Sequence, residues 1–127
     1  MRRILVGTDR SETAGRAVAF AAEMAERYGA ELVVLQVVRS GTDASTVERD
    51  LAPYAEGLGG RPLVRAGDDA ARVIVDAARA EKVDVVVVGS VGMMGRKEFL
   101  LDNVPNRVSH NAPCTVVIVQ TDREARR

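Results

Sequence analysis

The chain has 127 residues, of which 46% are apolar, and its 18 basic side chains balance 18 acidic ones. A chain of this length can bury one core without disulfides or metal. The charge balance gives no overall attraction toward nucleic acid or an anionic membrane, so neither is expected as a partner.

The termini and the single cysteine predict a cytoplasmic protein. Cys114 has no partner for an internal disulfide, which fits a reducing compartment. The chain enters an apolar strand directly after Arg3, without the long apolar stretch and cleavage site of a signal peptide. No apolar run approaches the ~20 residues of a membrane span. We expect one domain over residues 1–121 and a charged C-terminal tail over 122–127.

The first half of the chain alternates strands with helices. Residues 4–6 predict a strand, and apolar residues at helical spacing predict a helix that begins near Ser11 and ends at Gly29. The nearly continuous apolar run over 32–38 predicts a strand covered on both faces. A weaker helical pattern follows, and Pro53 inside it predicts a kink or a split.

The second half continues the alternation. Pro62 opens a short third strand over 62–64, and because proline cannot donate a ladder hydrogen bond, an edge or strand-start position is expected. The next helix is capped by Asp68 or Asp69 and carries Ala70, Val73, Ile74, Ala77 and Ala78 on one face. The remaining predicted elements are a strand over 83–89, a helix over 104–111 and a last strand over 115–119.

This alternation predicts an α/β fold, an open doubly wound sheet of five parallel strands with about four helices on both faces. Ligands of such sheets bind beyond the carboxyl ends of the strands, where the strand order reverses. If the first and fourth strands flank that reversal, Gly7-Thr8-Asp9 and the stretch from Gly89 to Gly92 line one cleft.

The Gly89–Gly92 turn is the first candidate site. Its glycines permit positive φ angles and close backbone approach, and exposed N–H groups can cradle a phosphate. Ser90, Arg96 and Lys97 could add donors and charge. The alternative is a turn whose glycines serve only its geometry, since short glycine motifs often arise without a ligand.

Asp9 is the second candidate. A carboxylate directly after the first strand could bind a ribose hydroxyl or hold Mg²⁺ through water. Alternatively, Asp9 caps the helix that begins near Ser11, together with Thr8. Facing a glycine turn across the cleft, Asp9 is expected to contact a ligand.

Asp102 and Asn103 conflict with a phosphate site. Both are preferred N-cap residues, and Pro105 falls in the first helical turn that follows. A carboxylate repels a phosphate by about 1–4 kcal/mol at ~4 Å, depending on the effective dielectric constant. Asp102 can therefore take the place of an anion as readily as it accepts one.

No residue is assigned to catalysis. His110 stands near a helix C-terminus, where a dipole or packing role is expected, and Cys114 at the start of an apolar strand indicates an inert core thiol. The sequence contains no recognisable Ser/His/Asp set, His/Cys metal cluster or paired-carboxylate motif.

Several ordered segments resemble the universal stress protein family along nearly the whole chain. The resemblance is carried by residues 4–12, 35–38, 67–68, 80–90 and 110–119. It implies a strand order of 3-2-1-4-5 and a homodimer formed through the last strand, Thr115 to Val119. It also implies a division between members that bind ATP and members that do not.

The ATP-binding members carry G-x-x-G, nine residues, and then G-S or G-T. Gly89, Gly92 and the spacing of nine match this pattern, whereas Asp102 and Asn103 replace the final pair. The resemblance further implies that Asp9 lies near the nucleotide and that the backbone of Val37 meets the adenine, with Val88 and Val104 as apolar neighbours. Arg10 stands where the family often has glycine, Gly7 where it often has proline, and Arg10 could contact a phosphate.

Two functions from different classes follow from the resemblance. The first is a stress-response regulatory protein that binds ATP or AMP, with Mg²⁺ as a further candidate cofactor and at most slow ATP hydrolysis. The second is a dimeric interaction or signalling module without nucleotide, which is expected if Asp102 blocks the phosphate site. A nucleotidyl transferase, a pyrophosphatase and a phosphoacceptor receiver are disfavoured because their signature residues are missing.

Overall fold

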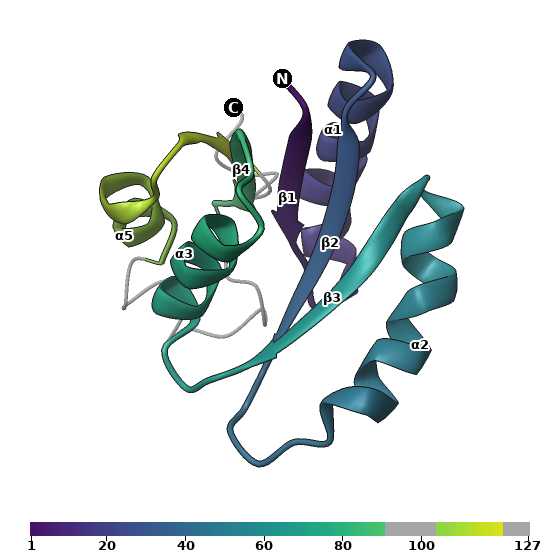
Figure 1. Cartoon of the computed structure of the whole chain (residues 1–127), viewed down its shortest axis with the longest axis vertical. Helices are drawn as coiled ribbons and strands as arrows, with labels where there is room; N and C mark the ends of the chain where they lie inside the picture. The colour runs from purple at the N-terminus through teal and green to yellow at the C-terminus, as the bar shows by residue number, and fades with distance from the viewer. Residues whose placement is uncertain (91–103, 121–127) are drawn as a thin grey trace.

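The computed structural model describes residues 1–90 and 104–120, apart from the Thr13 side chain. Five parallel strands form one sheet in the order β3-β2-β1-β4-β5 (Figure 1). The strands are β1 (Arg3–Gly7), β2 (Glu31–Val38), β3 (Gly60–Ala66), β4 (Val85–Gly89) and β5 (Thr115–Val119). The described helices are α1 (Glu12–Tyr28), α2 (Ala44–Gly57), α3 (Ala70–Ala80) and α5 (Val104–Asn111).

The helices cover both faces of the sheet, which confirms the predicted doubly wound α/β fold. Helices α3 and α5 lie on one face and α1 and α2 on the other (Figure 1). Side chains alternate along the strands: Leu5 packs under α3 and α5, whereas Ile4 and Val6 pack under α1 and α2. Because helices bury both sides, the central strands can be apolar throughout.

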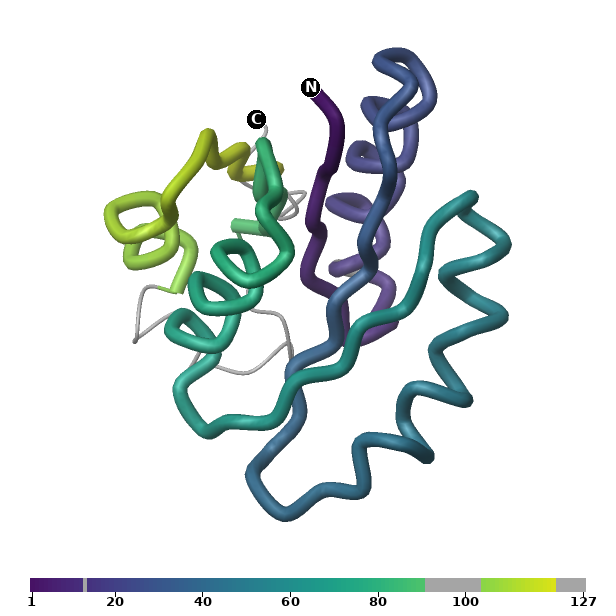
Figure 2. Tube along the Cα trace, in the orientation of Figure 1, coloured from purple at the N-terminus to yellow at the C-terminus, as the bar shows by residue number. Residues whose placement is uncertain are grey.

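The strand order reverses between β1 and β4. The chain proceeds from β1 outward to β2 and β3, then returns past β1 to β4, as the colours in Figure 2 show. Strands β1 and β4 pair directly, with Ile4 opposite Val85 and Val6 opposite Val87. The carboxyl ends of β1 and β4 therefore lie side by side, as the sequence predicts.

Local signals place the helix ends correctly. The Ser11 hydroxyl caps α1 by accepting from the Ala14 amide, and Gly29 ends that helix in the left-handed conformation at φ 63°. Of the two candidate caps for α3, Asp69 is the one that caps. Helix α2 is not split at Pro53, because this residue is on the exposed side, where water can satisfy the carbonyl that loses its donor.

Two predicted details agree only in part with the structure, namely the apolar face of α3 and the start of β4. The buried residues of α3 are Ala71, Ile74, Val75, Ala77 and Ala78, because the helix packs against both the sheet and α5, and this leaves Ala70 and Val73 only half-buried. Strand β4 begins at Val85 because the amide of Val83 still donates to the Ala78 carbonyl at the end of α3.

The two outer strands, β3 and β5, differ in how well their predicted bounds agree with the structure. Strand β3 is longer than predicted and runs beside β2 from Gly60 to Ala66, with Pro62 on an edge strand as expected. The predicted bounds of α5 and β5 are confirmed.

No described helix is both long and apolar enough to cross a membrane. The predicted tail over 122–127 lies outside the described residues.

Candidate functional site

The candidate residues that the structure describes meet at the carboxyl edge of the sheet. Gly7 ends β1 and Thr8 and Asp9 follow it, Val37 lies near the end of β2, and Gly89 ends β4. These three strands are neighbours in the sheet, so residues from three separate parts of the sequence are brought to one edge.

Thr8 organises the turn after β1. It is fully buried, its amide donates to the Leu35 carbonyl at 2.8 Å, and its hydroxyl accepts from the Arg10 amide at 2.9 Å. The first bond extends the contact between β1 and β2 by one residue. The second stabilises Arg10 at φ 65°, a left-handed conformation that glycine adopts more readily. Thr8 thus shapes the loop that presents Asp9.

Asp9 stands half-buried at the start of this loop. Its Oδ1 accepts from the Ser11 amide at 2.8 Å, which closes an Asx turn before the helix, while Ser11 itself is the N-cap. Its Oδ2 makes no hydrogen bond within the described part of the chain. One carboxylate oxygen is therefore used for the turn and the other is available to a ligand.

Arg10 does not turn toward the β4 end of the site. Its Nη1 donates to the Asp50 carbonyl of α2 at 3.3 Å. Because α2 covers the half of the sheet that contains β2 and β3, the guanidinium points away from Gly89. In the structure the Arg10 guanidinium is thus engaged by α2, and its contact with a phosphate stays a prediction.

On the β4 side of the strand-order reversal, Ser90 is hydrogen-bonded to the residues at the end of β5. Its amide donates to the Val119 carbonyl at 2.8 Å, and its hydroxyl donates to Oε1 of Gln120 at 2.6 Å. The Ser90 amide is thus engaged by the neighbouring strand. The remaining loop candidates, Gly92, Arg96, Asp102 and Asn103, lie outside the described residues, as does Lys97.

The apolar candidates share one face of the sheet. Val88 and Val104 are buried in the core cluster under α3 and α5, and Val37 is half-buried against the same cluster. Helix α5 is seated there by Val104 and Val108, and Pro105 occupies its first turn as expected. These residues place an apolar wall on the α3 and α5 side of the strand ends.

The start of α3 contributes contacts that sequence reasoning missed. Asp69 caps α3 and also accepts from Nη2 of Arg107 on α5 at 2.8 Å. The Arg107 guanidinium holds the pKa of the Asp69 carboxyl below its usual range. Asp68 accepts from the Ser40 amide at 3.1 Å, which connects this loop to the end of β2. Only the pair of opposite charges was visible in the sequence, and nothing local indicated that they meet.

Gly67 in the same loop has a steric role. An added Cβ would lie 2.5 Å from Cγ2 of Val73, closer than real contacts allow. Its amide also donates to the Val38 carbonyl at 2.8 Å. The loop between β3 and α3 therefore lies tightly against the strand end, which explains the glycine.

The other chemical candidates stay outside the site. His110 is exposed in the last turn of α5, and Cys114 is half-buried beside the core, where burial raises the pKa of its thiol. A raised pKa leaves little thiolate at neutral pH, which agrees with an inert thiol. Within residues 1–90 and 104–120, no three His, Cys, Asp or Glu residues group as metal ligands.

Comparison with known proteins identifies the family. A sequence model described as the Universal stress protein family matches residues 1–58 and 48–120. A universal stress protein of Mycobacterium tuberculosis is 30% identical over 144 residues, which cover 94% of this chain and 97% of that protein. The universal stress protein YxiE of Bacillus subtilis is 26% identical and covers 93% of this chain and 98% of its own.

Solved structures agree on the fold. A universal stress protein in complex with cAMP superimposes with a TM-score of 0.75 at 24% identity, covering 95% of this chain and 98% of its own. The protein from Archaeoglobus fulgidus in complex with dAMP has a TM-score of 0.68 at 20% identity, covering 94% and 98%. With the family model matched along nearly the whole chain and a relative 30% identical over 94% of it, this chain belongs to the universal stress protein family.

Proposed function

We propose that this protein is a stress-response regulator that binds ATP or AMP at the carboxyl edge of its sheet, without fast turnover. The observation that carries the proposal is the meeting of Asp9, Val37 and Gly89 on three adjacent strands at the reversal of strand order. The complexes of two structural neighbours with cAMP and dAMP support an adenine nucleotide as the ligand.

Each end of the nucleotide would meet different chemistry. The Oδ2 of Asp9 can accept from a ribose hydroxyl, or from a water bound to Mg²⁺, while Oδ1 keeps the turn in place. The half-buried Val37, which packs against the core cluster that contains Val88 and Val104, offers an apolar surface to a purine ring. The phosphates would meet the Gly89–Gly92 stretch, where Asp102 and Asn103 replace the family's final Gly-Ser step. In this proposal the residues for the base and sugar match the family, and the residues at the phosphate end are altered.

Calorimetric titration with ATP, AMP and adenosine, each with and without Mg²⁺, tests this proposal. We expect adenosine and AMP to compete comparatively well with ATP, because the altered residues lie at the phosphate end. The variant Asp9→Asn keeps an oxygen for the Ser11 amide but loses the charge, so it should weaken binding without unfolding the turn. Asp76→Asn on the exposed side of α3 is the matched control. Absence of binding by all three ligands at millimolar concentration would end the proposal.

A second variant tests the role of Asp102. Replacing Asp102 by Gly together with Asn103 by Ser restores the family motif and removes a carboxylate that repels phosphate by about 1–4 kcal/mol at ~4 Å. We expect ATP to gain affinity while adenosine stays unchanged. An unchanged ATP affinity would show that the electrostatic reasoning is wrong.

The alternative function is a dimeric interaction module that binds no nucleotide. Strand β5 is an outer strand of the sheet and Ile118 on it is 45% exposed, so its outer edge, which no strand within residues 1–90 and 104–120 pairs with, can receive a second copy. Light scattering of the purified protein should show a dimer, and Ile118→Lys should shift it toward monomer. A dimer that persists in this variant would place the interface elsewhere, and a dimer without nucleotide binding would favour the module.

A further inference from the structure

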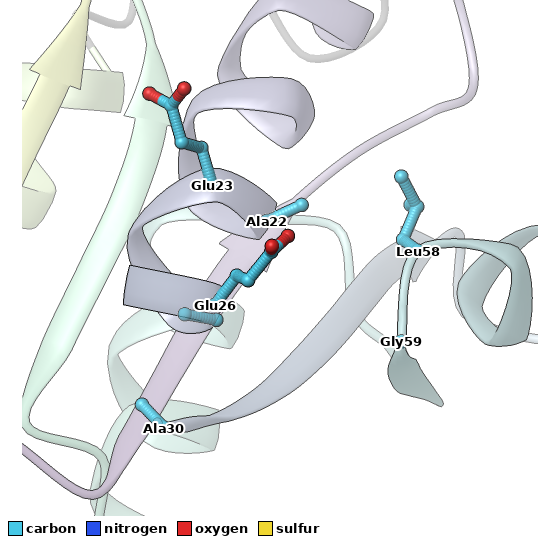
Figure 3. Close-up of a pocket in the computed structure, with 7 residues that line it drawn as sticks. Ala22, Glu23, Glu26, Ala30, Leu58 and Gly59 are labelled. Carbon is cyan, nitrogen blue, oxygen red and sulfur yellow. The ribbon is translucent and has the colours of Figure 1, made fainter. Parts of the chain in front are cut away.

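A pocket lies at the opposite edge of the sheet from the candidate nucleotide site. It has a volume of about 490 Å³ and lies between the C-terminal half of α1 and the turn that joins α2 to β3 (Figure 3). Its lining residues are Ala22, Glu23, Ala25, Glu26, Ala30, Leu58 and Gly59. Strands β2 and β3 begin directly after two of these residues, so the pocket belongs to the amino edge.

The walls of this pocket are preformed. Both turns that border it contain a left-handed glycine, Gly29 at φ 63° and Gly59 at φ 76°. The first turn is closed by a bond from the Ala30 amide to the Ala25 carbonyl at 2.9 Å, and the second by one from Gly59 to Glu56 at 3.0 Å. Binding here would not need to order a loop, which lowers its entropic cost.

The charge around the pocket is negative. The C-terminal ends of α1 and α2 both border it, and each helix end carries a partial negative charge. Figure 3 shows the Glu26 carboxylate directed toward the Leu58 side, and Glu26 has no ion pair or hydrogen-bonded side chain among the described residues. Glu23 has a weak partner, Arg27, at 3.8 Å with both side chains mostly exposed.

These acidic residues oppose the usual placement of charge on a helix. The last turn of α2 carries Glu56 and no basic residue. The last turn of α1 carries Glu26 together with Arg27, and Arg27 pairs with Glu23. Acidic side chains there raise the free energy of the helix because they face its negative end. A residue that breaks a local stability rule often serves binding, and Glu26 is the lining carboxylate that has no cation partner among the described residues.

We propose that the pocket binds a lysine side chain presented by a segment of a partner protein. The four-carbon stem would lie on the alanine floor and Leu58, and the ammonium would reach Glu26 and the negative helix ends. A lysine ammonium is a compact point charge that can lie near Glu26 and both negative helix ends at once, whereas a guanidinium would pair with the Glu26 carboxylate in a planar, two-bond contact. One exposed ion pair contributes little to the free energy of binding. The residues that flank the lysine in the partner must therefore supply further contact area.

Amide NMR titration tests the site with acetyl-Ala-Leu-Lys-Leu-Ala-amide as the probe. We expect shifts confined to residues 22–30 and 58–60, with no dependence on added nucleotide. The same peptide with an acetylated lysine should not cause these chemical-shift changes, because acetylation removes the positive charge. Glu26→Gln should weaken binding roughly threefold to fivefold and leave the fold intact, since it removes an unfavourable charge from a helix end. Glu12→Gln, at the other end of α1, is the matched control and should bind as the parent does.

Three results would overturn the proposal. Equal binding of the acetylated peptide would show that the pocket takes apolar chains without regard to charge. Free cadaverine that bound as tightly as the peptide would remove the need for a protein partner. If millimolar peptide caused no chemical-shift changes in the protein amides, or only changes at the carboxyl edge, the pocket would bind no lysine. None of these outcomes bears on nucleotide binding, which involves the other edge of the sheet.

Discussion

Asp69 allows a sharp test of how the candidate site is held together, because its two carboxylate oxygens have separate roles. One oxygen caps α3 by accepting from the Arg72 amide at 3.3 Å, and the other accepts from Arg107 at 2.8 Å. Asp69→Asn keeps a capping oxygen and removes the charge, whereas Asp69→Ala removes both. The two variants therefore separate the cap from the ion pair that joins α3 to α5.

The structure sets the expected size of each effect. Loss of an Asp cap costs about 1 kcal/mol of stability. The ion pair is worth less, since Asp69 and Arg107 are 46% and 44% exposed, and about 0.5 kcal/mol is appropriate for a screened surface pair. We expect Asp69→Asn to cost about 0.5 kcal/mol and Asp69→Ala about 1.5 kcal/mol. In a chain of this size the second value corresponds to a fall of roughly 5–7 °C in Tm.

Urea unfolding at several pH values measures both variants. Arg107 lowers the pKa of Asp69 in the folded state, so the stability from this pair is present above the unfolded pKa, near ~4, and is lost as the pH falls through the folded pKa. The difference in the free energy of unfolding between the parent and Asp69→Asn should therefore shrink in acid. NMR titration of the Asp69 carboxyl in Arg107→Gln should show its pKa move up toward the usual range. Equal losses in Asn and Ala variants, or an unmoved pKa, would refute this division of roles.

Two further predictions concern the turn after β1 and the opposite edge of the sheet. Thr8→Val removes the acceptor of the Arg10 amide and should cost about 1–2 kcal/mol in urea unfolding; Thr8→Ser keeps the hydroxyl, and an equal loss there would assign the effect to the methyl group instead. Hydrogen bonds from Arg61 and Arg3 lower the pKa of Glu31, so its contribution is present above ~4 and lost in acid. Because Glu31 is 42% exposed, Glu31→Gln should cost less than about 1 kcal/mol at neutral pH. The variant should also flatten the acid fall in stability, and a slope as steep as that of the parent would contradict this.

Local physical chemistry made much of the fold predictable. The alternation of apolar runs with helical spacing follows from which faces are buried, and that pattern is contained in each segment. The bounds of α5 and β5 and the roles of Ser11 and Gly29 agree with the structure for the same reason. A cap or a proline acts within a few residues, so its effect does not depend on the rest of the fold.

The sequence by itself determined the class of fold, the helix ends and the residues that follow each strand, because hydrophobic period and turn chemistry act over short distances. Only the tertiary structure decided which of these residues meet. Arg10 reaches Asp50 on α2 rather than the β4 side, and Asp69 pairs with Arg107, 38 residues away. The pocket between α1 and the turn after α2 has no signal in either segment alone. Such contacts depend on how helices pack on the two faces of the sheet, and the spacing of residues along one element does not contain that information.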